Sequence, residues 1–156
     1  MSPHLKIPLD KNWHFRQTSH LANGTTSSAY LPVSRFPTVA HLDLLSHGLI
    51  PDPYIDTNEL DCLWVNDADW SYRTTFASPG GVRGKCRAVL VFDGLDTVVE
   101  VFLNGQLVLE SVDMHVGHRV DVTELLMTKG TEDGKGEGEE GNVLELRFSN
   151  APAFAR

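Results

Sequence analysis

The sequence has 156 residues, 41 % of them hydrophobic, which is the size and composition of one domain with a single core. Acidic residues outnumber basic ones by 21 to 13, and the resulting net charge of −8 argues against binding to nucleic acid or an anionic membrane. We therefore expect one domain, residues 1–156, with neutral or polar partners and with neither nucleic acid nor a membrane among them.

The beginning of the chain and its cysteines both indicate a cytoplasmic protein. Residues 1–13 have no basic segment followed by an apolar run, so no signal peptide is predicted. The two cysteines, Cys62 and Cys86, are too few for the disulfide framework of a small secreted domain. Free thiols in the cytoplasm are the expectation, and one disulfide between the two cysteines is the alternative.

The first half of the chain combines two strand patterns with one long irregular segment. Residues 13–17 are a weak strand candidate, and residues 31–66, which contain four prolines, are interpreted as irregular. In residues 70–76 bulky side chains occupy alternate positions. This alternation predicts a half-buried strand with Ser71 and Arg73 on its outer face.

The second half contains the strongest local signal. Residues 87–92 form a continuous apolar run, which predicts a strand covered on both faces. Residues 97–109 place Asn104 and Gly105 between two apolar segments, and this dipeptide supplies the positive φ angles of a type I′ turn. A tight hairpin is therefore predicted there, followed by a weaker strand candidate at residues 119–122.

The last part of the chain completes an all-β pattern. Residues 121–126 could form a single helical turn capped by Asp121 or Thr123, and helix is otherwise nearly absent. Residues 129–141 are acidic and rich in glycine, which predicts a mobile loop, and residues 142–148 alternate as a strand. The prediction is an antiparallel sandwich or jelly roll.

A series of motifs then resembles, in order and spacing, the β-mannosidases of glycoside hydrolase family 2. The segment Pro-Thr-Val-Ala-His-Leu-Asp-Leu-Leu at residues 37–45 begins the most distinctive part. The motifs lie at residues 9–15, 37–45, 48–54, 58–59, 64–65, 69–72, 92–97, 103–105 and 113–123. The resemblance implies an N-terminal jelly-roll domain similar to galactose-binding modules, joined in the whole enzyme to immunoglobulin-like domains and a (β/α)8 barrel.

The sequence departs from this family pattern in one segment. Where the family suggests Asn-Met-Phe followed by Val-Pro-His, the chain has Asp-Met-His at residues 113–115 and Val-Gly-His at residues 116–118. The resemblance therefore gives less support to a role of this segment at a sugar site.

The family resemblance also implies what the chain lacks. The full-length enzymes hydrolyse terminal non-reducing β-D-mannose residues with retention, using two barrel glutamates whose carboxyl groups lie about 5–5.5 Å apart. This chain is expected to be a fragment or truncated product without those glutamates, and to be inactive alone. It is also expected to lack the last strand or strands of its sandwich, which would leave an open sheet edge for self-association. The alternatives are a stand-alone carbohydrate-binding module and a module that packs against other domains.

The resemblance places a few residues near a β-mannoside substrate. Asn58 and Glu59 are the main candidates, because their loop is expected to reach toward the sugar pocket of the barrel; the alternative is that Asn58 only caps a turn. Asp52 and Met114 are weaker candidates. Trp64 could stack on a sugar ring, whereas the other two tryptophans, at positions 13 and 70, are expected in the core.

No metal, cofactor or catalytic residue is predicted. His115 and His118 are the closest histidine pair, and no third ligand stands at a recognisable spacing. The carboxylates between residues 52 and 61 are interpreted as a solvated loop, because nothing in the sequence holds two of them at a fixed separation.

Overall fold

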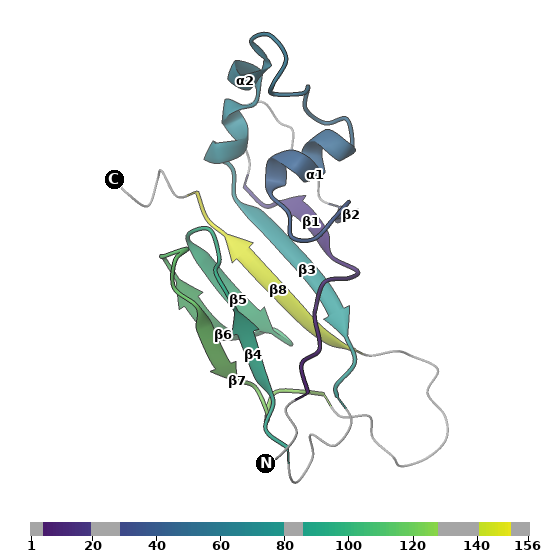
Figure 1. The fold of residues 1–156 in the computed structure, drawn as a ribbon, viewed down its shortest axis with the longest axis vertical. Helices are drawn as coiled ribbons and strands as arrows, with labels where there is room; N and C mark the ends of the chain where they lie inside the picture. Colours follow the sequence, from purple (N-terminus) through teal and green to yellow (C-terminus); the bar gives the residue numbers. More distant parts are fainter. Residues whose placement is uncertain (1–4, 20–28, 80–85, 128–140, 151–156) are drawn as a thin grey trace.

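The chain is an antiparallel β-sandwich with a helical cap at one end (Figure 1). The structure is a computed structural model that describes residues 5–19, 29–79, 86–127 and 141–150. A six-stranded sheet has the order β2-β1-β3-β8-β5-β6, and a two-stranded sheet pairs β4 with β7. The strands are β1 (His14–Gln17), β2 (Leu31–Pro32), β3 (Trp70–Phe76), β4 (Val89–Phe92), β5 (Val99–Leu103), β6 (Gln106–Ser111), β7 (His118–Asp121) and β8 (Asn142–Phe148). The all-β, antiparallel prediction is confirmed.

The inner face of the large sheet forms most of the core. Its strands alternate buried and exposed residues, as a sheet with one face on a core requires. Phe15, Val101 and Leu103 are almost completely buried, and both tryptophans expected in the core, Trp13 and Trp70, are buried there. The strand predicted over residues 70–76 coincides with β3.

One outward position of β3 differs from the prediction. Ser71 is fully buried although it lies on the outer face. The Tyr30 hydroxyl lies 2.9 Å from its Oγ, and Ser71 itself donates to Glu145 at 3.0 Å. The Arg16 guanidinium stacks over the Tyr30 ring at 4.5 Å. A local polar and aromatic cover, which strand periodicity does not encode, therefore buries this serine.

The small sheet corrects a second expectation. A strand covered on both faces was predicted for residues 87–92, but β4 is buried only at Leu90, while Val89 and Val91 are exposed. Leu90 pairs with Val120 of β7 and faces the core. The prediction was wrong because a two-stranded layer has the core on one side and solvent on the other, whereas an apolar run looks the same in either case.

The hairpin prediction is confirmed. Asn104 and Gly105 have φ angles of 52° and 82°, the left-handed pair that a type I′ turn requires. The turn joins β5 to β6, whose register shifts between Val101 and Phe102. Residues 121–126 form a single turn, as predicted, in which the backbone N–H groups of Leu125 and Leu126 donate to the Val122 carbonyl at 3.0 and 3.2 Å. Asp121 Oδ1 caps it by accepting from the Thr123 backbone N–H at 3.0 Å.

The segment interpreted as irregular, residues 31–66, contains most of the helical residues that the structure describes. They are α1 (Ala40–Ser46), α2 (Asn58–Asp61) and the 3-10 helix η1 (Leu63–Asp67). Helices this short are not stable alone. They persist because Leu44, Ile50 and Val65 are buried against the sandwich. We call residues 38–69 the cap. The loop predicted at residues 129–141 lies almost entirely outside the described residues.

Candidate functional site

Two loops that carry predicted site residues leave the large sheet from the same end. Trp70 pairs with Phe148, Phe148 pairs with Val99, and Val99 pairs with Ser111, so these residues form one row across β3, β8, β5 and β6. The cap precedes Trp70, and a loop at residues 112–117 follows Ser111. Three strand spacings separate β3 from β6, so the cap and the 112–117 loop leave the sheet roughly 14 Å apart. We call this end of the sandwich, visible next to α1 and α2 in Figure 1, the cap end.

The cap is anchored by its aromatic and apolar residues. Trp64 packs against Trp70 with ring centroids 6.1 Å apart, and Trp70 Nε1 donates to the carbonyl of Val65 at 3.0 Å. Trp64 is partly buried against the core. Packing therefore fixes the Trp64 ring, and only its exposed part could contact a sugar.

Asp52 and Asn58 organise the loop before α2. Asp52 Oδ1 accepts from the backbone N–H of Tyr54 at 3.0 Å, and Asn58 Nδ2 donates to the Asp52 carbonyl at 2.9 Å. The amide of Asn58 thus stabilises a turn, which is one of the two roles that the sequence predicted for it. Among the described residues its Oδ1 accepts no hydrogen bond, and Glu59 beside it is exposed. These two side chains remain the predicted substrate-proximal residues.

The cap also exposes an unusual number of large apolar side chains. Tyr54 is 96 % exposed, and Leu60 and Leu63 are each more than half exposed. The exposed apolar side chains of the cap are Val39, Leu49, Tyr54, Ile55, Leu60 and Leu63. Exposed apolar residues gathered in one short segment are typical of a surface that meets another protein surface.

The 112–117 loop is held by close backbone packing. A Cβ atom added to Gly94 would lie 2.5 Å from the carbonyl oxygen of Met114. Asp113 Oδ1 accepts from the His115 backbone N–H at 2.8 Å. Met114 is 42 % exposed at the cap end. The loop therefore has a defined conformation, and its methionine lies at the same end as the cap but not next to Asn58.

A buried carboxyl group beneath the cap was not predicted from the sequence. Asp43 in α1 is completely buried, and Tyr72 of β3 donates to its Oδ2 at 3.0 Å, whereas Oδ1 has no hydrogen-bond partner among the residues that the structure describes. Burial raises the pKa of Asp43, although Thr38, Tyr72 and other polar neighbours favour its charged form. An acidic residue inside the apolar run at residues 42–45 was the signal that could have revealed it.

Replacing Asp43 with asparagine is expected to remove part of the pH dependence of stability. Because the folded pKa is raised above 3.8, the folded state holds this proton more tightly than the unfolded chain. Stability from this group is thus complete below the unfolded pKa and falls as pH rises through the folded pKa. Asparagine cannot ionise, so D43N should gain stability relative to the parent as pH rises toward neutrality, measured by urea unfolding.

Tyr72→Phe is the matched control for this prediction. It retains the carboxyl group and removes the hydrogen bond that lowers its pKa, so its pH dependence should be steeper than the parent's. Parallel pH profiles for the parent and D43N would contradict the prediction.

The described residues contain no group of three or more histidine, cysteine or acidic side chains that could hold a metal ion. His118, considered above as a ligand, instead has its Nε2 3.0 Å from Ser111 Oγ. In the same part of the chain, no helix has the length and apolar character needed to cross a lipid bilayer.

The two-sheet architecture with a looped end defines a galactose-binding-like domain. Residues 13–156 match the family model described as glycosyl hydrolase 2 galactose-binding domain-like. The chain belongs to this family of glycoside hydrolase domains, as the sequence resemblance implied.

Several relatives with curated names are β-mannosidases. The chain is 53 % identical over 132 residues to β-mannosidase B of Thermothelomyces thermophilus, covering 85 % of this chain and 15 % of the relative. It is 40 % identical over 151 residues to β-mannosidase B of Neosartorya fischeri, covering 97 % of this chain and 16 % of the relative. The chain thus spans about a sixth of the length of these relatives.

Solved structures agree with the fold. The β-D-mannosidase of Dictyoglomus thermophilum has a TM-score of 0.75 and 30 % identity, over 94 % of this chain and 16 % of that chain. The exo-chitosanase of Amycolatopsis orientalis has a TM-score of 0.64 at 20 % identity, over 88 % of this chain and 16 % of that chain, which supports the fold alone.

Proposed function

We propose that this chain serves as the N-terminal domain of a β-mannosidase that hydrolyses terminal non-reducing β-D-mannose residues in β-mannosides with retention. The observation that carries the proposal is the similarity to β-mannosidases over nearly the whole domain, in both sequence and structure. The carboxyl pair of a retaining glycosidase would belong to another domain of the enzyme. This domain would therefore contribute to carbohydrate breakdown through binding and positioning, not through chemistry.

The cap end is the proposed contact with the catalytic domain. Its exposed apolar residues, including Tyr54 and Leu60, would be buried against that domain. Asn58, fixed by its hydrogen bond to the Asp52 carbonyl, would then present its Oδ1 toward substrate, with Glu59 beside it. Trp64 and Met114 would border the same end at greater distance.

Steady-state kinetics on the full-length enzyme containing this domain test the proposal. Asn58→Ala and Glu59→Gln should each lower kcat/KM for a chromogenic β-mannoside by roughly tenfold or more, the effect of one lost polar contact to substrate. Ser46→Ala, an exposed residue of the cap outside the predicted contacts, is the control and should leave kcat/KM unchanged. The 156-residue chain alone should release no product. Parent-like kinetics in both variants, or turnover by the chain alone, would overturn the assignment.

Self-association through an open sheet edge is a further part of the proposal. Within the described residues, β2 and β6 lie at the edges of the large sheet, and β4 and β7 each pair with one strand only. β7 carries Arg119 and Asp121, which discourage edge pairing, whereas β4 exposes Val89 and Val91. The β4 edge is therefore the proposed contact between copies of the isolated chain.

Sedimentation measurements at increasing concentration should show dimers or larger species of the isolated chain. Val91→Lys should shift the population toward monomer, because a charged side chain disfavours strand pairing. Thr75→Lys on β3 provides the matched control, since that residue is exposed on a strand that has a neighbour on each side. A monomeric parent at high concentration would eliminate the edge contact.

A cytoplasmic location is also proposed. Cys62 is buried and Cys86 is exposed, and both are free thiols. An exposed free thiol is typical of a reducing compartment, because it would oxidise readily outside one. Labelling with a thiol-specific reagent in intact cells and in lysates would test the location.

A further inference from the structure

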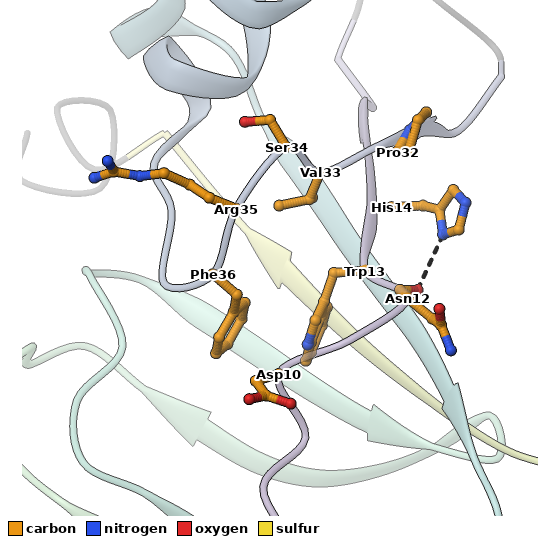
Figure 2. Close-up of a pocket in the computed structure, with 9 residues that line it drawn as sticks. All are labelled: Asp10, Asn12, Trp13, His14, Pro32, Val33, Ser34, Arg35 and Phe36. Atoms are coloured by element: carbon orange, nitrogen blue, oxygen red, sulfur yellow. Dashed lines mark hydrogen bonds between the residues drawn. The ribbon is translucent and has the colours of Figure 1, made fainter.

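A pocket beside the first strand combines an aromatic surface with polar side chains (Figure 2). It has a volume of about 370 Å³ and lies between residues 10–14 and residues 32–36. Val33 N–H donates to the Trp13 carbonyl at 2.9 Å, and His14 pairs with Pro32, so backbone bonds fix the two walls relative to each other. The pocket is therefore part of the folded structure.

The aromatic part is rigid. Phe36 stacks on Trp13 with ring centroids 5.4 Å apart and an angle of 11° between the planes. Trp13 is buried, and its Nε1 donates to the Leu9 carbonyl at 2.7 Å. Phe36 by contrast is 47 % exposed. A fixed ring lying on the core thus holds a second ring at the surface, where it can receive an apolar face of a ligand at little cost in side-chain entropy.

Polar groups surround these rings. Figure 2 shows the Asp10 carboxylate below the two rings, and Asn12 and His14 on the side of Trp13 away from Phe36. His14 Nδ1 lies 3.0 Å from the Asn12 carbonyl, which orients the imidazole. Within the described residues the side chains of Asp10 and Asn12 make no hydrogen bond. Their acceptors and donors are available to a ligand.

The size and charge of the pocket define the class of ligand. Its volume is at the lower end of small-ligand pockets, which are about 300–1,000 Å³. The Asp10 carboxylate lies beside the rings and disfavours an anionic ligand, whereas the Arg35 guanidinium points away from them (Figure 2). A pyranose has apolar C–H faces that pack on aromatic rings and adjacent hydroxyls that bond to carboxylate and amide groups. We infer that this pocket is a second binding site for one or two units of a neutral saccharide, lined by other residues than the predicted substrate-proximal Asn58 and Glu59.

Titration of methyl β-D-mannopyranoside and β-1,4-mannobiose into the isotope-labelled chain, followed by amide NMR, tests the inference. Saturable shifts in the millimolar range are expected at residues 10–14 and 33–36. Phe36→Ala should weaken binding of mannobiose roughly tenfold, through the lost ring contact. Tyr54→Ala, which removes an exposed aromatic of the cap, is the matched control and should bind as the parent does.

A second variant keeps the inference testable if Phe36→Ala does not fold. Asn12 has a φ of 59°, which glycine adopts without strain, so Asn12→Gly removes the amide and preserves the backbone. It should weaken mannobiose binding several-fold while the rest of the spectrum stays parental. Absence of saturable shifts at residues 10–14 and 33–36, or an affinity equal to the parent's in both Asn12→Gly and Phe36→Ala, would overturn the inference. These readouts are independent of the kinetic test of Asn58, so the two can fail separately.

Discussion

Replacing Asn142 with leucine should lower the free energy of unfolding by about 3–5 kcal/mol, because it leaves several buried polar groups without partners. Asn142 is 1 % exposed. Its Oδ1 accepts from Met127 N–H at 2.7 Å and from Asn104 Nδ2 at 3.0 Å. Its Nδ2 donates to Ser78 Oγ at 2.8 Å and to the Phe76 carbonyl at 3.3 Å. One amide thus joins β3, β8, the hairpin turn and the segment after β7.

Asn104 is the second half of this arrangement. Its Nδ2 also donates to the Leu125 carbonyl at 2.8 Å, and its Oδ1 accepts from Val143 N–H at 2.8 Å. The residue at the left-handed position of the turn is therefore also a cross-link between strands. Asn104→Gly would retain the positive φ and lose these bonds, so its loss of stability separates the side-chain contribution from that of the backbone.

Urea unfolding followed by circular dichroism measures both effects. Asn66→Leu is the matched control, since it makes the same replacement at an exposed position and should change stability by no more than about 0.5 kcal/mol. If Asn142→Leu lowered the free energy of unfolding by less than about 1 kcal/mol, the prediction would be wrong. Water or local rearrangement would then be bonding the polar groups that had paired with the Asn142 amide.

Replacing Gly94 with alanine should cost about 2 kcal/mol and displace the 112–117 loop, because the added Cβ would meet backbone that cannot rotate away. The Cβ would lie 2.5 Å from the carbonyl oxygen of Met114. At Gly117 the nearest atom, the Phe92 carbonyl oxygen, would be 3.4 Å away. Gly117→Ala is therefore the matched control, with a change of about 0.5 kcal/mol or less.

Thermal unfolding and the NMR signal of the Met114 methyl group report this prediction together. A shifted methyl signal in Gly94→Ala, with cap signals unchanged, is expected because the cap lies roughly three strand spacings, about 14 Å, away. Equal stability of the two alanine variants would contradict the close approach of the two loops.

Local features of the sequence predicted the parts of the fold that depend on local physics. The alternation at residues 70–76 identified β3, since side chains of a strand point to opposite faces in turn. Asn104-Gly105 identified the hairpin, because few other residue pairs tolerate two consecutive positive φ angles. Ordered motifs identified the family, whereas the segment that forms the helical cap was interpreted as irregular.

The tertiary structure alone decided the burial and the contacts between distant segments. The exposure of Val89 and Val91 depends on β4 lying in a two-stranded layer, and the short helices of the cap depend on the apolar residues they bury. Asp43 and Tyr72 are 29 residues apart in sequence, and Asn104 and Asn142 are 38 apart. The alternation of apolar and polar residues indicates which face of a strand a side chain occupies. Its hydrogen-bond partners depend on which distant segments the fold brings next to it. For that reason composition, period and turn residues determined the fold class here, and only strand order and register brought together the buried carboxyl group, the paired amides and the Trp13–Phe36 pocket.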